Sequence, residues 1–352
     1  MTSLLDLINY GRENDCSDIH LTRDLSPVFR RNGKLFQSDF DYNPEETEAL
    51  ILSMLDPNQK ERLLASEDID FCHVTSEGFR QRVNIYKQQG SFAAAVRLLS
   101  DTIPSFEDLK LPPIIEKLAN MPRGLILITG PTGSGKSTTL ASMIDYINTN
   151  KASHILTIED PVEYKHEHKK GIVHQREVGV DVPSFATALR SCLREDPDVI
   201  LVGEMRDLET ISAAITAAET GHLVLSTLHT IGAANTIDRI IDVFPPHGQQ
   251  QIRTQLASIL KAVITQQLVP LADGSGRMAA LEVLVGTDAV LNLIRESKTH
   301  QLGSVMQTSA RDGMNTLNAH LAQLVKSQKI TYDTALEWSS DRAELTHYIE
   351  NR

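Results

Sequence analysis

Residues 130–137 read GPTGSGKS and match the phosphate-binding pattern G-x-x-x-x-G-K-S/T. The apolar run 124–129 precedes this match, and a helical pattern over 137–148 follows it. That strand–loop–helix order is the context in which the pattern binds phosphate, because glycines let backbone N–H groups turn toward an anion at a helix N-terminus. The motif therefore restricts this part of the chain to a nucleotide-binding α/β domain, against the alternative of a glycine-rich turn without a ligand.

The motif also assigns roles to particular side chains. Lys136 is expected to neutralise the β- and γ-phosphates of ATP, and the Ser137 hydroxyl is expected to ligate Mg²⁺. The predicted nucleotide-binding residues are Gly130, Pro131, Thr132, Gly133, Ser134, Gly135, Lys136, Ser137 and Thr138.

The surrounding pattern predicts a parallel sheet covered by helices on both faces. Apolar strands are expected at 154–159, 199–202 and 223–227, with helices at 183–195 and 208–220, and with helices only after residue 287. Residues 1–100 instead predict a small α+β domain. Helices are expected at 3–14 and over 44–65, the second region being broken into two helices at Asp56-Pro57. Short strands are expected at 17–21, 27–31, 33–36, 79–86 and 92–99. The predicted domains are 1–100, a proline-containing linker 101–113, an ATPase domain 114–288 and a helical segment 289–352.

Acidic residues follow two of these strands. Glu159, Asp160 and Glu163 come at the end of the 154–159 strand, and Glu204 follows 199–202. Ligands of open α/β sheets bind at the carboxyl ends of the strands. Glu204 is therefore the predicted metal-coordinating acid, acting directly or through water, and Glu163 the predicted base or positioner of water. Glu159 and Asp160 are weaker metal candidates; the alternative for any one acid is that it caps a helix or faces solvent.

Two histidines flank the 223–227 strand. His229 lies at its carboxyl end, where an imidazole can sense the γ-phosphate, and His222 lies at the other end, where a structural or interfacial role is equally expected. His166 and His168 fall in the charged run 165–170, which we interpret as a solvated loop.

Three arginines lie in two successive predicted strands of the first domain: Arg80, Arg82 and Arg97. Most cations on a strand face are simply exposed. The functional alternative is that Arg82 and Arg97 act as arginine fingers on a γ-phosphate bound by a neighbouring subunit. The ATPase domain itself shows no clear cationic finger in its sequence.

Composition excludes several classes. The chain has 34 Lys+Arg against 46 Asp+Glu, a net charge of -12, which argues against binding to nucleic acid or insertion into an anionic membrane. Cys16, Cys72 and Cys192 form no C-x-x-C pair, which fits a reducing compartment. No apolar run has transmembrane length and no signal peptide is evident, so a cytoplasmic location is expected.

Several blocks together resemble the type II/IV secretion ATPase superfamily, most closely its PilT-type pilus retraction ATPases. SDIHL at 17–21 resembles the N-terminal signature, 130–137 the Walker A motif, 157–163 the Asp box, 201–210 the atypical Walker B motif and 220–229 the His box. Residues 289–296 resemble a C-terminal segment tied to retraction, with Leu291 where the family typically has Arg.

The resemblance implies a fold, a location and partners. It implies a PAS-like N-terminal domain joined to a RecA-like ATPase domain, assembled as a homohexamer at the cytoplasmic face of the inner membrane. The implied partners are an inner-membrane pilus platform protein and paralogous pilus ATPases. Extension motors usually carry a longer N-terminal region and a four-cysteine zinc insert, so the retraction branch is favoured, with twitching motility as the process served.

Other functions remain compatible with the sequence. A PilU-like accessory retraction ATPase and a pilus-extension or type II secretion ATPase are alternatives within the superfamily. From other classes, a RecA-type nucleic-acid translocase would show DNA-stimulated hydrolysis, and a P-loop kinase would transfer phosphate to an acceptor other than water. A non-hydrolysing nucleotide sensor would not need both Glu163 and Glu204.

Overall fold

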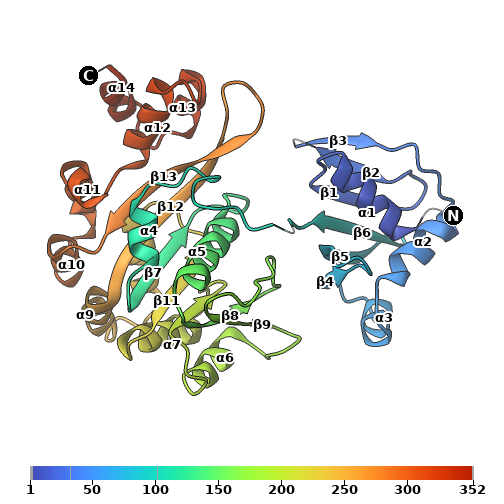
Figure 1. The fold of residues 1–352 in the computed structure, drawn as a ribbon, viewed down its shortest axis with the longest axis horizontal. Coiled ribbons are helices and arrows are strands. Elements are labelled where there is room, and N and C mark those ends of the chain that lie inside the picture. Colours follow the sequence, from blue (N-terminus) through green and yellow to red (C-terminus); the bar gives the residue numbers. More distant parts are fainter. Residues whose placement is uncertain (1–2, 32, 101, 351–352) are drawn as a thin grey trace. The chain divides into compact units, whose positions relative to one another are not determined.

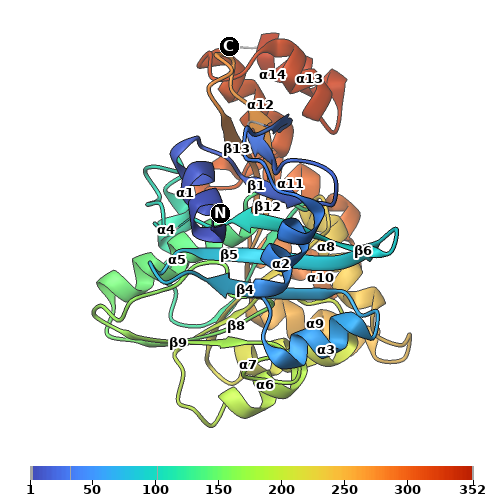
Figure 2. The same ribbon diagram turned by 90° about the vertical axis from the view of Figure 1, so that its right-hand side faces the viewer.

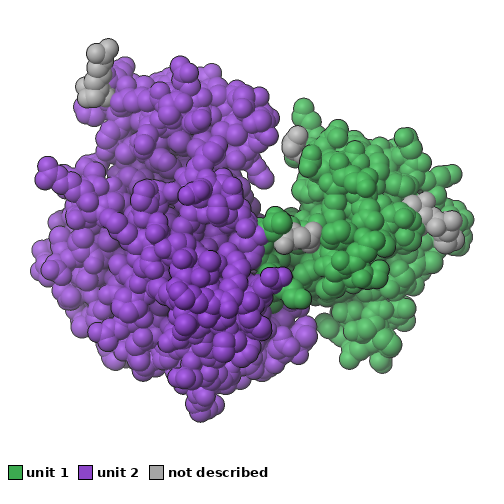
Figure 3. Space-filling model, in the orientation of Figure 1, with its two compact units in different colours: residues 1–102, 161–165 green, residues 103–160, 166–352 purple. Residues whose placement is uncertain are grey.

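The computed structural model describes residues 3–31, 33–100 and 102–350. Two compact units make up the chain (Figure 3): unit 1 contains residues 1–102 and 161–165, and unit 2 contains residues 103–160 and 166–352. Asp101, where the predicted linker begins, lies outside the described residues, as do residues 1–2 and 351–352 at the ends of the predicted domains.

Unit 1 is a six-stranded antiparallel sheet with helices. The strand order is β3-β2-β1-β6-β5-β4, with β1 Asp18–Leu21, β2 Val28–Arg31, β3 Lys34–Gln37, β4 Ile69–Val74, β5 Arg80–Gln88 and β6 Ser91–Leu98. The helices are α1 Leu4–Glu13, α2 Pro44–Ser53 and α3 Pro57–Leu64, each started by a reciprocal capping box. The predicted strands and helices are confirmed, including the break at Asp56-Pro57; β4 is an additional strand.

The helices of unit 1 cover one face of its sheet. On β5, Gln81, Val83 and Ile85 are buried, and Val83 and Ile85 join the core formed with α1, α2 and α3. Figure 2 shows α1 and α2 lying across this sheet, and both contact β6. Because side chains alternate along a strand, Arg80 and Arg82 lie on the opposite face of the sheet, away from the helices.

Unit 2 contains the parallel sheet that the sequence predicts (Figure 1). The strand order is β13-β12-β7-β11-β10-β8-β9, with β7 Gly124–Thr129, β8 His154–Glu159, β9 Ile172–Glu177, β10 Val199–Val202, β11 Leu223–Leu228, β12 Leu260–Pro270 and β13 Arg277–Val285. Only the β12–β13 pairing is antiparallel. Strands β9, β12 and β13 are additions to the predicted set.

Helices cover both faces of this sheet, as predicted. They are α4 Ile114–Ala119, α5 Lys136–Asn150, α6 Phe185–Cys192, α7 Leu208–Glu219, α8 Ala233–Asp242 and α9 Gln249–Ile259. Strand β7 sends Ile126 and Ile128 into the core with α4 and α5, and Leu125 and Leu127 into the core with α6 to α9. A strand buried on both faces reads as a continuous apolar run, which is why β7 is evident from the sequence.

After β13 the chain is helical, which confirms the prediction for the C-terminal part. The helices are α10 Asp288–Arg295, α11 Leu302–Thr308, α12 Leu317–Lys326, α13 Tyr332–Trp338 and α14 Arg342–Glu350, with short 3₁₀ turns at Thr299–Gln301 and Ala310–Asp312. Leu291 of α10 is half-buried against the sheet's core, whereas α12 to α14 share a core with β12 and β13. Among the described residues, no helix is both long and apolar enough to cross a membrane.

Candidate nucleotide-binding and catalytic site

The order of the strands brings the predicted site residues of unit 2 to one edge. Strands β7, β11, β10 and β8 are consecutive parallel neighbours, so their carboxyl ends meet at the same edge of the sheet. The phosphate loop follows β7, His229 follows β11, Glu204 follows β10, and Glu159 ends β8.

The phosphate loop has a backbone that requires glycine. Gly130 has φ 136° and Gly135 has φ 88°, both in the region that only glycine adopts readily. A Cβ at Gly130 would lie 2.2 Å from the backbone oxygen of Gln266, and a Cβ at Gly135 would lie 2.7 Å from the Gln266 side-chain nitrogen. The loop is therefore packed directly against β12, with no room for side chains at these two positions.

Lys136 points back into the loop that precedes it. Its side chain is 8% exposed, and Nζ donates hydrogen bonds to the Gly130 and Pro131 carbonyls at 2.8 and 2.9 Å. Helix α5 begins here without a side-chain cap, and the Ser134 hydroxyl is buried without a hydrogen-bond partner. A cation, an uncapped helix N-terminus and an orphaned hydroxyl together fit a phosphate chain.

Gln266 of β12 holds the loop in place, a role that no sequence motif indicates. It is 2% exposed, donates from Nε2 to the Ser134 carbonyl at 2.7 Å, and accepts at Oε1 from the Thr139 hydroxyl at 2.9 Å. One amide thus joins the loop and the first turn of α5 to the neighbouring strand.

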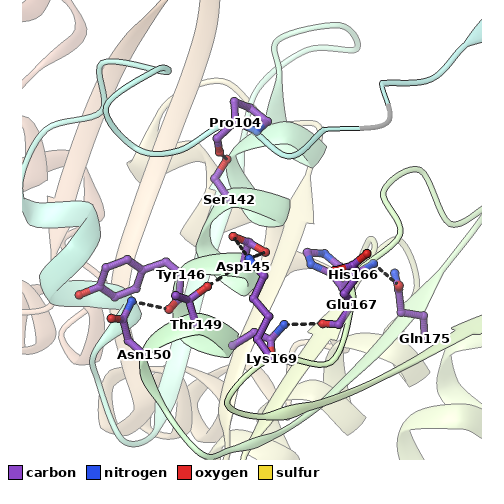
Figure 4. A network of polar contacts seen from close by, with 11 residues as sticks. Pro104, Ser142, Asp145, Tyr146, Thr149, Asn150, His166, Glu167, Lys169 and Gln175 are labelled. Atoms are coloured by element: carbon purple, nitrogen blue, oxygen red, sulfur yellow. Dashed lines mark hydrogen bonds and ion pairs between the residues drawn. The ribbon is translucent and has the colours of Figure 1, made fainter.

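A cavity of about 180 Å³ lies beside the loop. Its walls are residues 108–111, Gly135, Thr138 and Thr139 of the loop and α5, and Gln266, Leu268, Leu271, Arg277, Met278 and Ala279 of the β12–β13 hairpin. The wall residues 108–111 belong to the predicted linker, whose residues 103–113 pack within unit 2. Phe106 stacks on Tyr146 at 5.0 Å, and the Ser142 hydroxyl of α5 donates to the Pro104 carbonyl at 2.7 Å (Figure 4).

Glu204 and His229 come together as their positions on the sheet predict. His229 Nε2 lies 3.3 Å from Glu204 Oε2, and the Glu204 side chain is 19% exposed. Arg206 Nε lies 2.7 Å from the same carboxylate oxygen. The sequence analysis did not single out Arg206 as a cation next to Glu204, because only the turn of the backbone after β10 returns its side chain toward that carboxylate.

Glu159 is engaged within the sheet edge. It accepts hydrogen bonds from the Thr157 hydroxyl at 2.6 Å and from Gln175 Nε2 at 3.2 Å. Asp160 is exposed and lies on the wall of a separate hollow beside α6 and α7. Among the described residues, no group of three or more His, Cys, Asp or Glu side chains is arranged to hold a metal ion by itself.

Glu163 lies outside this assembly of unit 2 residues. It belongs to Pro161–Lys165, the segment that packs within unit 1. The carbonyl of Val162, the residue before it, accepts a hydrogen bond from Arg80 Nη2 at 2.8 Å.

Arg82 and Arg97 are directly opposite each other on β5 and β6. Arg82 pairs with Asp70 through two hydrogen bonds of 2.7 and 3.2 Å, and Arg97 Nε lies 3.1 Å from Asp18 Oδ1. Their side chains are 34% and 59% exposed. Exposed pairs of this kind contribute about 0–1 kcal/mol, so either arginine can exchange its acid for another anion at little cost.

The interpretation of 165–170 as a solvated loop is wrong for His166. The segment is a loop, but His166 is 8% exposed, and its burial lowers the pKa to about 4. His166 packs beside α5 while its backbone N–H donates to Gln175 Oε1 at 2.8 Å (Figure 4). His222 Nδ1 lies 2.8 Å from the Ala217 carbonyl at the end of α7, a structural contact.

Comparison with known proteins gives a consistent family. Residues 104–328 match the family model "Type II/IV secretion system protein". The "Twitching motility protein" of Neisseria gonorrhoeae is 47% identical over 311 residues, covering 88% of this chain and 83% of that protein. The "Type IV pilus retractation ATPase PilT" of Pseudomonas aeruginosa is 44% identical over 335 residues, covering 95% of this chain and 97% of that protein.

A solved structure agrees with these relatives. The crystal structure of "the Pilus Retraction Motor PilT and Bound ADP" superimposes with a TM-score of 0.91 and 48% identity, covering 99% of this chain and all of that one. The phosphate loop, the sheet that carries it and these matches lead to one conclusion: the chain belongs to the type II/IV secretion system protein family.

Proposed function

We propose that this chain is an ATP-hydrolysing motor subunit that powers retraction of a type IV pilus. The observation that carries the proposal is the phosphate loop. Lys136 and the uncapped N-terminus of α5 lie at this loop, and its backbone has no room for a side chain at Gly130 or Gly135. The relatives named for twitching motility and pilus retraction support the choice of process.

The residues of unit 2 bind the nucleotide in this proposal. The N–H groups at the start of α5 and the Lys136 ammonium hold the triphosphate, exchanging the two loop carbonyls that Lys136 now contacts for phosphate oxygens. The cavity beside Thr138 and Gln266 would hold the base and sugar of the nucleotide, because it lies next to the phosphate loop and has partly apolar walls. Ser137 and Glu204 would hold Mg²⁺, with Glu159 and Asp160 as weaker candidates; when bound, the ion would neutralise charge on the phosphate oxygens.

Hydrolysis then needs a base and a water molecule. Glu163 accepts a proton from the water whose oxygen attacks the γ-phosphorus, the bond from the γ-phosphorus to the β–γ bridging oxygen breaks, and ADP and inorganic phosphate leave. His229, whose Nε2 lies 3.3 Å from Glu204 Oε2, would sense the γ-phosphate. Arg82 and Arg97 of a neighbouring subunit in a homohexamer would stabilise charge in the transition state. Force would pass to an inner-membrane platform protein at the cytoplasmic face.

A cellular assay tests the process as well as the chemistry. A piliated bacterium that lacks its own retraction ATPase is supplied with the wild-type chain, with Glu163→Gln or with the control Glu167→Gln, an exposed acid of the neighbouring loop. We expect labelled pili to retract with the wild type and the control but not with Glu163→Gln. Restored pilus extension without retraction, or retraction by Glu163→Gln, would contradict the proposal.

A further inference from the structure

The segment that carries Glu163 crosses between the two units. The chain leaves unit 2 after Asp160, runs through Pro161–Lys165 within unit 1, and returns to unit 2 at His166. We call Pro161–Lys165 the crossing segment. Its residue Val162 is only 7% exposed, so this part of the segment is packed within unit 1 and is not a solvated loop.

Arg80 fixes the middle of the crossing segment. Its Nη2 donates to the Val162 carbonyl at 2.8 Å and lies 3.1 Å from Cys72 Sγ on the adjacent strand. The Arg80 backbone is itself held, because its carbonyl accepts hydrogen bonds from Leu99 N at 3.1 Å and from Arg12 Nη2 at 3.3 Å. Arg82 and Arg97 form ion pairs with carboxylates. By contrast, the Arg80 guanidinium donates a hydrogen bond to a neutral carbonyl, that of the residue before Glu163.

Gln175 contacts the residues that flank the crossing segment on both sides. From β9, its Nε2 donates to Glu159 Oε1 at 3.2 Å, and its Oε1 accepts from His166 N at 2.8 Å. Asn148 of α5 also holds the chain where it returns to unit 2, by donating to the Glu167 carbonyl at 2.7 Å. The ends of the crossing segment are thus tied to unit 2 and its middle is tied to unit 1.

We infer that Arg80 is a positioning residue for Glu163, acting in cis. By holding Val162, it makes the Glu163 backbone follow unit 1, while Gln175 keeps the two ends of the crossing segment in unit 2. The inference rests on the proposed function, in which Glu163 is the base. Its consequence is that loss of Arg80 displaces the base but leaves the nucleotide-binding residues of unit 2 in place, so hydrolysis falls while ATP affinity is kept.

The test compares variants of the full-length assembled protein. Arg80→Met keeps much of the side-chain length but removes the donors, and Arg80→Lys keeps a cation that reaches a carbonyl less rigidly. The matched control is Lys87→Met on the same strand, since Lys87 Nζ also donates to a backbone carbonyl, that of Leu64, at 3.0 Å. ATP turnover, ATP affinity and hydrogen exchange of residues 161–165 are measured for each.

We expect Arg80→Met to lower kcat by about 10–100-fold, since misplacing a catalytic group by about 1 Å costs this much. ATP affinity should stay within about twofold, exchange at 161–165 should rise, Arg80→Lys should recover part of kcat, and Lys87→Met should resemble the wild type. In a Glu163→Gln background, Arg80→Met should cause no further loss, because both changes remove the same group from the reaction.

Three results overturn the inference: an unchanged kcat, the same loss in Lys87→Met, or full multiplication of the losses in the double variant, which would make Arg80 an independent finger. Normal turnover by Glu163→Gln alone would instead refute the proposed function. If Arg80→Met does not fold, Arg80→Lys and Gln175→Leu decide: both must lower kcat at unchanged ATP affinity, and normal kcat in both overturns the inference.

Discussion

Replacing Gln266 by leucine removes a side chain that joins the phosphate loop to β12. Leucine is close to glutamine in volume, so the change leaves little cavity. It does leave the Ser134 carbonyl and the Thr139 hydroxyl without the hydrogen bonds of 2.7 and 2.9 Å that Gln266 provides. Each buried group left unpaired costs about 1–3 kcal/mol. With two such groups, we expect Gln266→Leu to lower the free energy of unfolding by roughly 2–6 kcal/mol.

The same change should weaken nucleotide binding. The loop backbone presents its N–H groups to phosphate, and in this variant it loses the hydrogen bond that holds Ser134. Part of the free energy of nucleotide binding is then used to order the loop. A loss of about 1.4–2 kcal/mol corresponds to a rise in the Kd for ADP of roughly 10–30-fold. Urea denaturation without nucleotide gives the first quantity, and calorimetric titration with ADP gives the second.

Gln267→Leu is the matched control. Gln267 is also buried, at 8% exposure, but as the next residue along β12 it faces the other side of the sheet. We expect ADP to bind this variant within about twofold of the wild type. Equal ADP affinities for Gln266→Leu and Gln267→Leu, both folded, would refute the reasoning that Gln266 organises the phosphate loop.

Three further predictions concern chemistry, assembly and pH. Glu163→Gln should still bind ATP while phosphate release falls by about 10²–10⁴-fold; loss of binding with normal residual turnover would move the role of base to Glu159 or Glu204. Inactive Arg82→Ala/Arg97→Ala protomers mixed with inactive Glu163→Gln protomers should regain activity, and mixed rings that stay inactive would leave these arginines as surface residues. Burial lowers the pKa of His166 to about 4 from 6.5, so the unfolded chain binds the extra proton as the pH falls below 6.5. Stability should therefore drop by about 2 kcal/mol between pH 8 and pH 5, and equal pH dependence in His166→Gln would contradict this.

The strands that carry the site could be predicted because both of their faces are buried. Strands β7, β8, β10 and β11 are short apolar runs, and a motif of fixed spacing marks the end of β7. Once parallel order is assumed, Glu204 and His229 must lie at the same edge as Lys136. By contrast, β9 is an edge strand with the polar sequence IVHQRE, and β12 carries Thr265, Gln266 and Gln267 in its middle, so neither shows a simple pattern.

What the sequence did not show depends on contacts between distant residues. Gln266 reaches Ser134 across 132 positions, and Arg80 reaches Val162 across 82, and no local pattern predicts such a meeting. His166 sits among charged neighbours that are exposed, so its burial follows only from the packing of the loop against α5. Arg206 was overlooked because its side chain returns to Glu204 only after the turn that follows β10.

The most direct test of the account is phosphate release from ATP by the purified chain carrying Lys136→Ala. The control is Lys151→Ala at the other end of α5, whose ammonium donates to the Ala119 carbonyl at 3.1 Å. We expect a loss of at least about 10²-fold for Lys136→Ala with its fold intact, because the triphosphate loses its main cation, and near-normal turnover for Lys151→Ala. Turnover by Lys136→Ala at the wild-type rate would contradict the assignment of the phosphate loop and, with it, the proposed ATP-driven motor.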